Sequence, residues 1–129
     1  IINKRKKFWK FHEKNLKDII HKKIIFVQNS KKGYFNSEYI YTILLNKNKF
    51  FLRDKLISFL KENNISSTVH YIPANQHSYY KKKFINFKLI NSDYIFNNVI
   101  SLPFHNKLNT RDITRVTNVI KLFFKNNDV

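Results

Sequence analysis

The sequence predicts an α+β domain in which a small antiparallel or mixed sheet is flanked by helices. Apolar residues recur with helical spacing in residues 3–20, 52–63 and 110–125. Short apolar or alternating runs, which are typical of strands, lie before and after the middle helix. These runs are residues 24–27, 39–45, 66–71 and 99–102. The 129 residues, 43% of them hydrophobic, suffice for one domain with its own core, and no repeat or linker indicates a second.

Residues 3–20 form the first predicted helix, with lysines over most of its surface. Its apolar side chains fall near one stripe: Trp9, Leu16, Ile19 and Ile20. His12 lies at the edge of this stripe, where a single histidine is more often packed or exposed than a ligand. Residues 24–27 follow as a short apolar run. Gly33 is the only glycine and is therefore the expected site of a positive φ angle.

Residues 39–45 are apolar on both faces, which predicts an inner strand covered on both sides. Helical spacing then returns in residues 52–63, and Asn63-Asn64 can end that helix because asparagine tolerates the left-handed conformation. Residues 66–71 alternate as a strand would. This places Ser66, Thr68 and His70 on one face, and Ser67, Val69 and Tyr71 on the other.

The last third of the chain has the clearest pattern. Residues 89–97 favour a short helix, and residues 99–102 are an extended run stopped by Pro103. Asn109 or Thr110 is a good N-cap for the closing helix, with the negative charge of Asp112 in its first turn. The apolar stripe of this helix consists of Ile113, Val116, Ile120 and Phe123.

The formal net charge is +17, which ordinarily indicates a partner that bears phosphates, such as nucleic acid or an anionic membrane. The excess is almost all lysine, spread along the chain with many Asn, Ile, Phe and Tyr residues. Those are the residues that an A+T-rich genome over-supplies. We therefore interpret the charge as a solvated lysine coat and expect neither nucleic acid nor a membrane as partner. The alternative is a small basic nucleic-acid-binding domain, in which Tyr79 and Tyr80 stack on bases beside the lysines of residues 81–83.

Several classes of site are disfavoured. There is no cysteine, hence no disulfide or thiolate metal site, which fits the cytoplasm. No apolar run approaches the roughly 18–20 residues that cross a bilayer. One glycine cannot build a phosphate loop. His70, His77 and His105 lack the helical spacing and the carboxylate that a metal site would favour, so we expect no metal. The chain starts at Ile1 and has no Met, so we expect a piece of a longer protein.

The candidate binding loop runs from residue 68 to residue 80. Its polar and aromatic side chains could line a cleft for a polyhydroxylated or phosphorylated ligand. The candidate substrate-binding residues are His70, Tyr71, Asn75 and His77. A surface histidine that is merely solvated or satisfied remains the alternative for His70.

Six segments, in order, resemble the C-terminal small domain of the DegT/StrS-type PLP-dependent aminotransferases, which act on nucleotide-linked keto-sugars. The segments are Arg5 and Trp9, residues 36–45, Arg53 with Leu56 and Leu60, Asn64-Ile65, His70-Tyr71-Ile72-Pro73, and Ser101-Leu102-Pro103 before the closing helix. The HYIP form looks most like the branch that makes 4-amino-4,6-dideoxy sugars, such as dTDP-4-amino-4,6-dideoxygalactose transaminases.

The resemblance implies that residues 1–129 are the small domain of a fold type I enzyme whose large domain is absent. The whole enzyme would pass an amino group, from glutamate, to a nucleotide-linked 4-keto-6-deoxy sugar for surface polysaccharide or lipopolysaccharide biosynthesis. The large domain would hold pyridoxal 5'-phosphate on its lysine and form a homodimer. No lysine of this chain is nominated, and no residue is assigned as catalytic, cofactor-binding or metal-binding. The isolated piece would be inactive; an inactive remnant of such an enzyme is a further alternative.

The resemblance also implies roles for the loop. His70 would donate to a sugar hydroxyl or a diphosphate oxygen, and Tyr71 would pack against or bond the hexose. The position two after Pro73, often His in the family, is Asn75, with His77 displaced by two. Strand alternation would point His70 and Tyr71 apart, so both reach one ligand only if the strand ends at His70.

Overall fold

The computed structural model describes residues 1–28, 33–83 and 87–129. The predicted α+β class is confirmed, because these residues form three antiparallel strands and five α-helices. The elements are, in chain order, α1 (Ile2–His21), β1 (Ile25–Val27), β2 (Tyr41–Leu45), the 3-10 helix η1 (Lys47–Leu52), α2 (Arg53–Glu62), the 3-10 helix η2 (Ala74–Gln76), α3 (Ser78–Lys83), α4 (Ile90–Asn98), β3 (Val99–Leu102) and α5 (Thr110–Asn126).

The sheet has the order β1-β2-β3, and both pairs of neighbours are antiparallel. In the register of β1 and β2, Ile25 lies opposite Leu45. β2 is therefore the central strand, as predicted, although it begins at Tyr41 rather than at Tyr39. One face of β2 is buried and the other is half-buried, so the expected cover on both sides is complete on one side only. β3 has the predicted bounds, and all four of its residues are buried.

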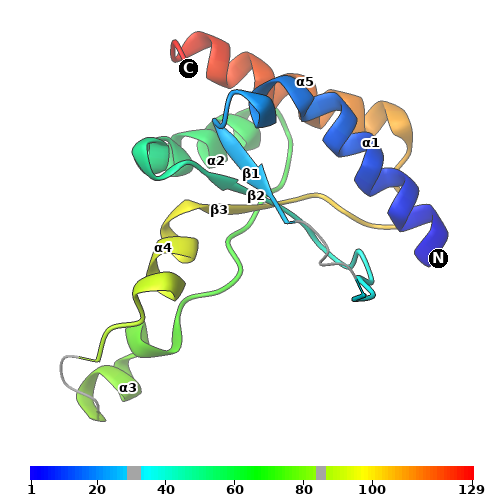
Figure 1. Ribbon diagram of the computed structural model, residues 1–129. Coiled ribbons are helices and arrows are strands. Elements are labelled where there is room, and N and C mark those ends of the chain that lie inside the picture. The colour runs from blue at the N-terminus through cyan, green and yellow to red at the C-terminus, as the bar shows by residue number, and fades with distance from the viewer. Residues whose placement is uncertain (29–32, 84–86) are drawn as a thin grey trace.

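Three helices, α1, α2 and α5, cover one face of the sheet (Figure 1). The predicted stripe of α1 is buried at Trp9, Leu16 and Ile19. All four residues of the predicted α5 stripe are buried too. Removing each such side chain from water contributes about 1.5–3 kcal/mol.

His12 lies inside this layer, fully buried. Its Nδ1 hydrogen-bonds the Phe8 carbonyl oxygen at 3.0 Å, and its ring stacks on the Tyr41 ring with the centroids 4.4 Å apart. Burial lowers the pKa of His12 below its ordinary value, and the hydrogen bond to Phe8 offsets this only in part. The sequence left open whether His12 is packed in the core or exposed, and the structure shows that it is packed in the core.

Local signals for turns and caps are confirmed in three places. Gly33 has φ +88° and Asn64 has φ +56°. Asn109, rather than Thr110, caps α5: its Oδ1 accepts hydrogen bonds from the backbone N–H groups of Arg111 and Asp112. The Asp112 carboxylate accepts from the Asn109 backbone N–H, which completes a capping box.

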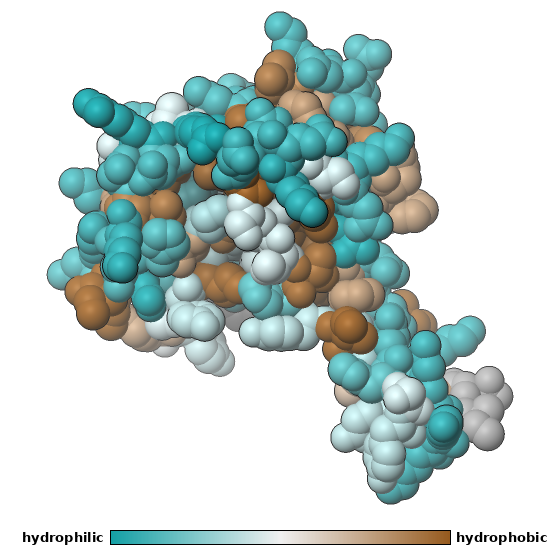
Figure 2. Space-filling view, turned by 180° about the vertical axis from the view of Figure 1, so that it is seen from behind, coloured by the Kyte–Doolittle hydropathy of each residue, from teal (hydrophilic) through white to brown (hydrophobic). Residues whose placement is uncertain are grey.

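Residues 71–83 and 87–98, called the arm below, project from the sheet and carry η2, α3 and α4 (Figures 1 and 2). The predicted helix over residues 89–97 is confirmed as α4, displaced by one residue. Within the described part of the arm only Pro73 and Asn98 are buried. None of the helices in the described ranges combines the length and the hydropathy that a bilayer crossing requires.

Candidate functional site

The segment that leads into the candidate loop follows α2. Ile65 is buried and its backbone N–H donates to the Leu60 carbonyl at 2.8 Å, which ends the helix. The predicted strand over residues 66–71 is wrong. Only Thr68 pairs with β3: its N–H donates to the Ser101 carbonyl at 3.1 Å and its carbonyl accepts from the Ser101 N–H at 2.8 Å. Alternating side chains indicate that a segment has a polar face, but they do not show that a neighbouring strand will accept its backbone hydrogen bonds. Here the chain leaves the sheet after a single bridge.

His70 is held at the point where the chain leaves the sheet. Its Nδ1 lies 2.7 Å from the Ser101 Oγ, and Ser101 is itself 3% exposed. The Thr68 Oγ1 lies near both ring nitrogens, at 3.4 and 3.5 Å. The imidazole is half-buried, so it is neither enclosed in the core nor free to rotate. A buried serine on β3 therefore fixes the Nδ1 edge of the ring, and the Nε2 edge has only the longer, 3.4 Å contact with the Thr68 Oγ1.

Tyr71 lies beside His70. The two ring centroids are 4.6 Å apart with an interplanar angle of 62°, which is an edge-to-face contact. The peptide bond between the two residues is cis. Tyr71 is 76% exposed. Because the regular strand ends before His70, the two rings share one side of the chain, and the conflict expected from alternation does not arise.

The next part of the loop is tied to α4 through one carboxylate. Gln76 Nε2 donates to an Asp93 oxygen at 2.6 Å, and Asn75 Nδ2 lies 3.4 and 3.5 Å from the two Asp93 oxygens. The Asn75 Oδ1 is buried and has no partner among the described residues. Asn75 therefore helps to hold the loop against α4. Sequence reasoning missed Gln76 and Asp93; the available signal was a carboxylate in the first turn of α4.

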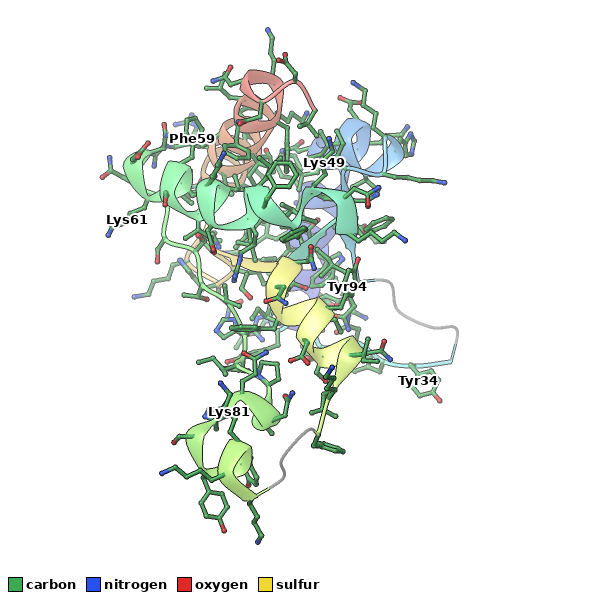
Figure 3. The ribbon with its side chains drawn as sticks, turned by 90° about the vertical axis from the view of Figure 1, so that its left-hand side faces the viewer. Tyr34, Lys49, Phe59, Lys61, Lys81 and Tyr94 are labelled. Carbon is green, nitrogen blue, oxygen red and sulfur yellow. The ribbon has the colours of Figure 1, made fainter. Side chains whose placement is uncertain are left out.

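His77 stands apart from this cluster, exposed at the start of α3. Tyr79 and Tyr80 follow on α3, with ring centroids 5.2 Å apart, and the Lys83 Nζ lies 5.8 Å from the centre of the Tyr79 ring. Figure 3 shows α3 at the far end of the arm and Lys81 on it. The structure therefore brings His70, Tyr71 and Asn75 into one segment and places His77 further along it.

Lysine is the side chain that could hold a cofactor as a Schiff base. Every lysine in the described ranges is exposed or half-buried, whereas a lysine that forms a Schiff base must be desolvated or placed beside another cation. Nor do three His, Cys, Asp or Glu side chains gather to hold a metal ion in that part of the chain.

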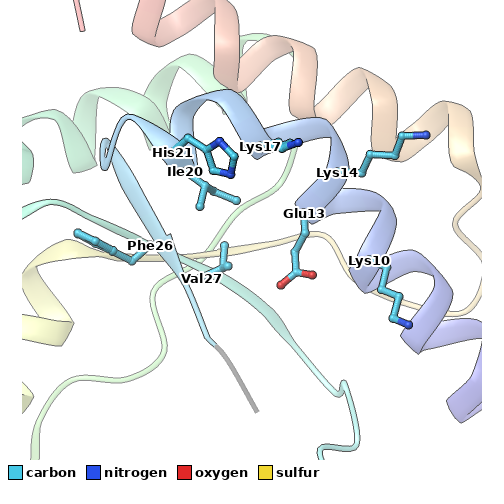
Figure 4. A pocket seen from close by; sticks show the side chains of 8 residues that line it. All are labelled: Lys10, Glu13, Lys14, Lys17, Ile20, His21, Phe26 and Val27. Atoms are coloured by element: carbon cyan, nitrogen blue, oxygen red, sulfur yellow. The ribbon is translucent and has the colours of Figure 1, made fainter. Parts of the chain in front are cut away.

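A groove of about 500 Å³ lies elsewhere, between α1 and β1 (Figure 4). Lys10, Lys14 and Lys17 line its helical side, and Phe26 and Val27 line its strand side. None of these residues belongs to the candidate loop. The groove is therefore separate from the cluster at His70.

Comparison with known proteins assigns the chain to a family. A model of the DegT/DnrJ/EryC1/StrS aminotransferase family matches residues 1–121. An uncharacterized protein of Methanocaldococcus jannaschii is 32% identical over 100 residues, which are 75% of this chain and 26% of that protein. The UDP-4-amino-4,6-dideoxy-N-acetyl-beta-L-altrosamine transaminase of Campylobacter jejuni is 29% identical over 111 residues, which are 86% of this chain and 29% of that enzyme.

Among solved structures, Helicobacter pylori PseC, an aminotransferase involved in the biosynthesis of pseudoaminic acid, has the same fold. The TM-score is 0.86 at 22% identity, and the match covers 97% of this chain and 33% of that one. The chain thus spans between a quarter and a third of the length of these relatives.

Proposed function

Since the chain belongs to the DegT/DnrJ/EryC1/StrS aminotransferase family, we propose that residues 1–129 are the C-terminal small domain of a longer sugar aminotransferase. The whole enzyme transfers an amino group from glutamate to a nucleotide-linked 4-keto-6-deoxy sugar for surface polysaccharide biosynthesis. It acts in the cytoplasm as a homodimer assembled through its large domain. The Campylobacter relative, named for a UDP-linked 4-amino-4,6-dideoxy sugar, supports this class of substrate.

Pyridoxal 5'-phosphate is the proposed cofactor, and in this proposal it is held by the large domain, as membership of the family implies. When bound, the cofactor supplies the electron sink for amino transfer. The contribution of this chain is recognition. Its loop forms one wall of the substrate cleft, with His70 and Tyr71 facing the sugar and with Asn75 and His77 extending the wall.

The observation that carries this proposal is the anchored imidazole of His70. When the buried Ser101 hydroxyl donates to Nδ1, the ring keeps its proton on Nε2, which then donates to a sugar hydroxyl or a diphosphate oxygen in place of the Thr68 Oγ1, 3.4 Å away. The exposed Tyr71 ring beside it offers a flat apolar surface and a phenol to the hexose. A fixed donor next to an aromatic ring suits a polyhydroxylated ligand.

A domain replacement tests the proposal. The matched 111-residue segment of the Campylobacter transaminase is exchanged for this chain, and amino transfer to the nucleotide keto-sugar is measured. We expect activity from the chimera, and neither activity nor cofactor absorbance from the isolated 129 residues. The Campylobacter enzyme lacking the segment is the control. A folded chimera that binds cofactor but transfers no amino group would support an inactive remnant instead.

A small basic nucleic-acid-binding domain is the second candidate, favoured by the exposed Tyr79 ring beside Lys83. Binding of single-stranded DNA across a salt series separates the two functions. A true binder loses affinity steeply as salt rises, and Tyr79→Ala weakens it about tenfold, since one stacked base contributes about 1–3 kcal/mol. We expect Tyr79→Ala to leave the residual charge-driven binding unchanged.

A further inference from the structure

Three large aromatic side chains are exposed on one short segment before β2. Tyr34 is 76% exposed, Phe35 69% and Tyr39 68%; these three residues are called the aromatic strip below. Figure 1 shows the segment at the end of the molecule where α1 begins, and Figure 3 shows Tyr34 pointing away from the body. Aromatic side chains gathered in the open are typical of interaction surfaces rather than of monomer surfaces.

Two cations from α1 hold the aromatic strip against the helix. The Lys6 Nζ lies 4.8 Å from the centre of the Phe35 ring, and the Arg5 guanidinium carbon lies 5.8 Å from the centre of the Tyr39 ring. Both cations are half-buried. The surface at the aromatic strip therefore combines aromatic rings with the neighbouring Arg5, and tyrosine and arginine are both frequent among the central residues of protein interfaces.

The backbone between these rings is also held in a defined shape. The Glu38 N–H donates to the Asn36 Oδ1 at 3.1 Å. Glu38 has φ +46°, in the left-handed region that residues other than glycine rarely adopt. A segment already fixed in an unusual conformation loses little freedom when a partner covers it.

We infer that the aromatic strip is the docking surface for the large, cofactor-binding domain of the same enzyme; this inference rests on the proposed function. The relatives are three to four times as long as the part of them that this chain matches, so the rest of such an enzyme is large enough to cover this surface. The docked face offers apolar area to the three rings and carboxylates to Arg5 and Lys6. A second copy of this chain is disfavoured, because each copy carries a net charge of +17.

Hydroxyl-radical labelling of aromatic side chains tests the docking surface directly. The isolated chain and the Campylobacter chimera described above are labelled in parallel. We expect Tyr34, Phe35 and Tyr39 to be labelled in the isolated chain and protected several-fold in the chimera. The exposed Phe50 and Phe51, on η1, are the internal comparison and stay labelled in both. Equal labelling of the strip in both proteins, or protection of η1 alone, would overturn the inference.

A double variant, Tyr34→Ser with Phe35→Ser, provides a second test that does not depend on labelling. In the isolated chain it lowers the melting temperature only slightly, because both side chains are exposed and the lost contact between Lys6 and Phe35 contributes at most about 1 kcal/mol at an exposed site. It also lowers the fluorescence of the apolar dye 8-anilinonaphthalene-1-sulfonate. In the chimera it speeds proteolysis at the domain junction. The matched control is Phe50→Ser with Phe51→Ser. Dye fluorescence and proteolysis that respond equally to both pairs would contradict a docking surface confined to the strip.

The two proposals fail in different ways. A chimera that transfers amino groups while its aromatic strip remains labelled retains the proposed function and rejects this surface. A chimera with a protected strip but no activity on any nucleotide keto-sugar rejects the proposed function and retains the surface. Dimerisation of the isolated chain that the double variant abolishes would assign the strip to a second copy and would also reject the inference.

Discussion

The body of the domain and its arm are stabilised by different forces. In the described ranges, every side chain of the hydrophobic core comes from the body, that is, from α1, α2, α5, the strands and their connections. The arm contributes none of them. Its loop and α4 are held together by polar contacts, above all by the 2.6 Å hydrogen bond between Gln76 and Asp93. The body is therefore held mainly by buried apolar side chains, whereas the loop of the arm is tied to α4 by polar contacts.

The candidate site lies where these two regions meet. His70 is the last residue before the arm, and Ser101, which anchors it, belongs to the buried strand β3. A rigid support for the imidazole and an exposed surface for a ligand are thus combined at one junction. This arrangement suits recognition, because a donor placed on a rigid element needs little reorganisation when the ligand binds.

The largest difference between body and arm should appear on truncation of an apolar side chain. Leu16, on α1, is fully buried, whereas Tyr79, on α3, is 63% exposed. We expect Leu16→Ala to lower the free energy of unfolding by about 2–5 kcal/mol, the range for a buried leucine. Tyr79→Ala should change it by less than about 0.5 kcal/mol. Urea denaturation followed by circular dichroism measures both. Similar losses for the two variants would remove the distinction.

Acid should destabilise the body through His12. Its pKa is lowered in the folded state, so above the ordinary value the protonation of His12 does not change stability. As the pH falls below about 6.5, the unfolded chain binds a proton that the folded chain refuses, and stability falls by up to about 1.4 kcal/mol per pH unit. The fall ends near the folded pKa.

Unfolding measured between pH 7 and pH 4 checks this prediction. His12→Gln should reduce the slope of the free energy of unfolding against pH by the contribution of one proton, whatever its effect on stability at pH 7. His21→Gln, an exposed histidine on the same helix, is the matched control and should keep the slope. If His12→Gln and the unchanged protein lose stability in parallel, His12 is not the group that titrates.

A smaller and more local effect is expected in the arm. Asp93→Asn removes the negative charge of the group that accepts hydrogen bonds from the Gln76 and Asn75 side-chain amides. A hydrogen bond to a charged group contributes about 1.5–3 kcal/mol, so amide exchange in η2 and the first turn of α4 should quicken by roughly tenfold or more. Global stability should hardly change, because the arm adds nothing to the core. Glu62→Gln, on the surface of α2, is the control and should leave exchange in the arm as it was.

The body could be predicted from the sequence because its signals are periodic and local. The stripe of α5, its Asn109 cap and the positive φ of Gly33 all follow from residue type and spacing. The strand over residues 66–71 could not be predicted correctly, since alternation does not reveal whether a neighbouring edge accepts a ladder. His12 sits at the edge of a stripe, where its sequence position alone leaves burial and exposure equally open.

The candidate site divides in the same way. His70 and Tyr71 could be nominated from the sequence because they precede a proline and a polar, aromatic loop and because the HYIP segment resembles a family motif; their role as site residues stays a prediction. The contact that orients His70 crosses from residue 70 to Ser101, and the contact that ties the loop crosses from Gln76 to Asp93. Such pairings depend on tertiary structure, and no local sequence pattern predicts them.

The most direct test of the account is the kinetic effect of His70→Gln in the Campylobacter chimera. Amino transfer to the nucleotide keto-sugar and cofactor absorbance are measured together, with His105→Gln, an exposed histidine outside the loop, as control. We predict that kcat/KM for the sugar falls at least about tenfold, which corresponds to one lost hydrogen bond, while cofactor absorbance stays the same. Unchanged kcat/KM in His70→Gln, or an equal loss in His105→Gln, would contradict the role of the loop as a wall of the substrate cleft.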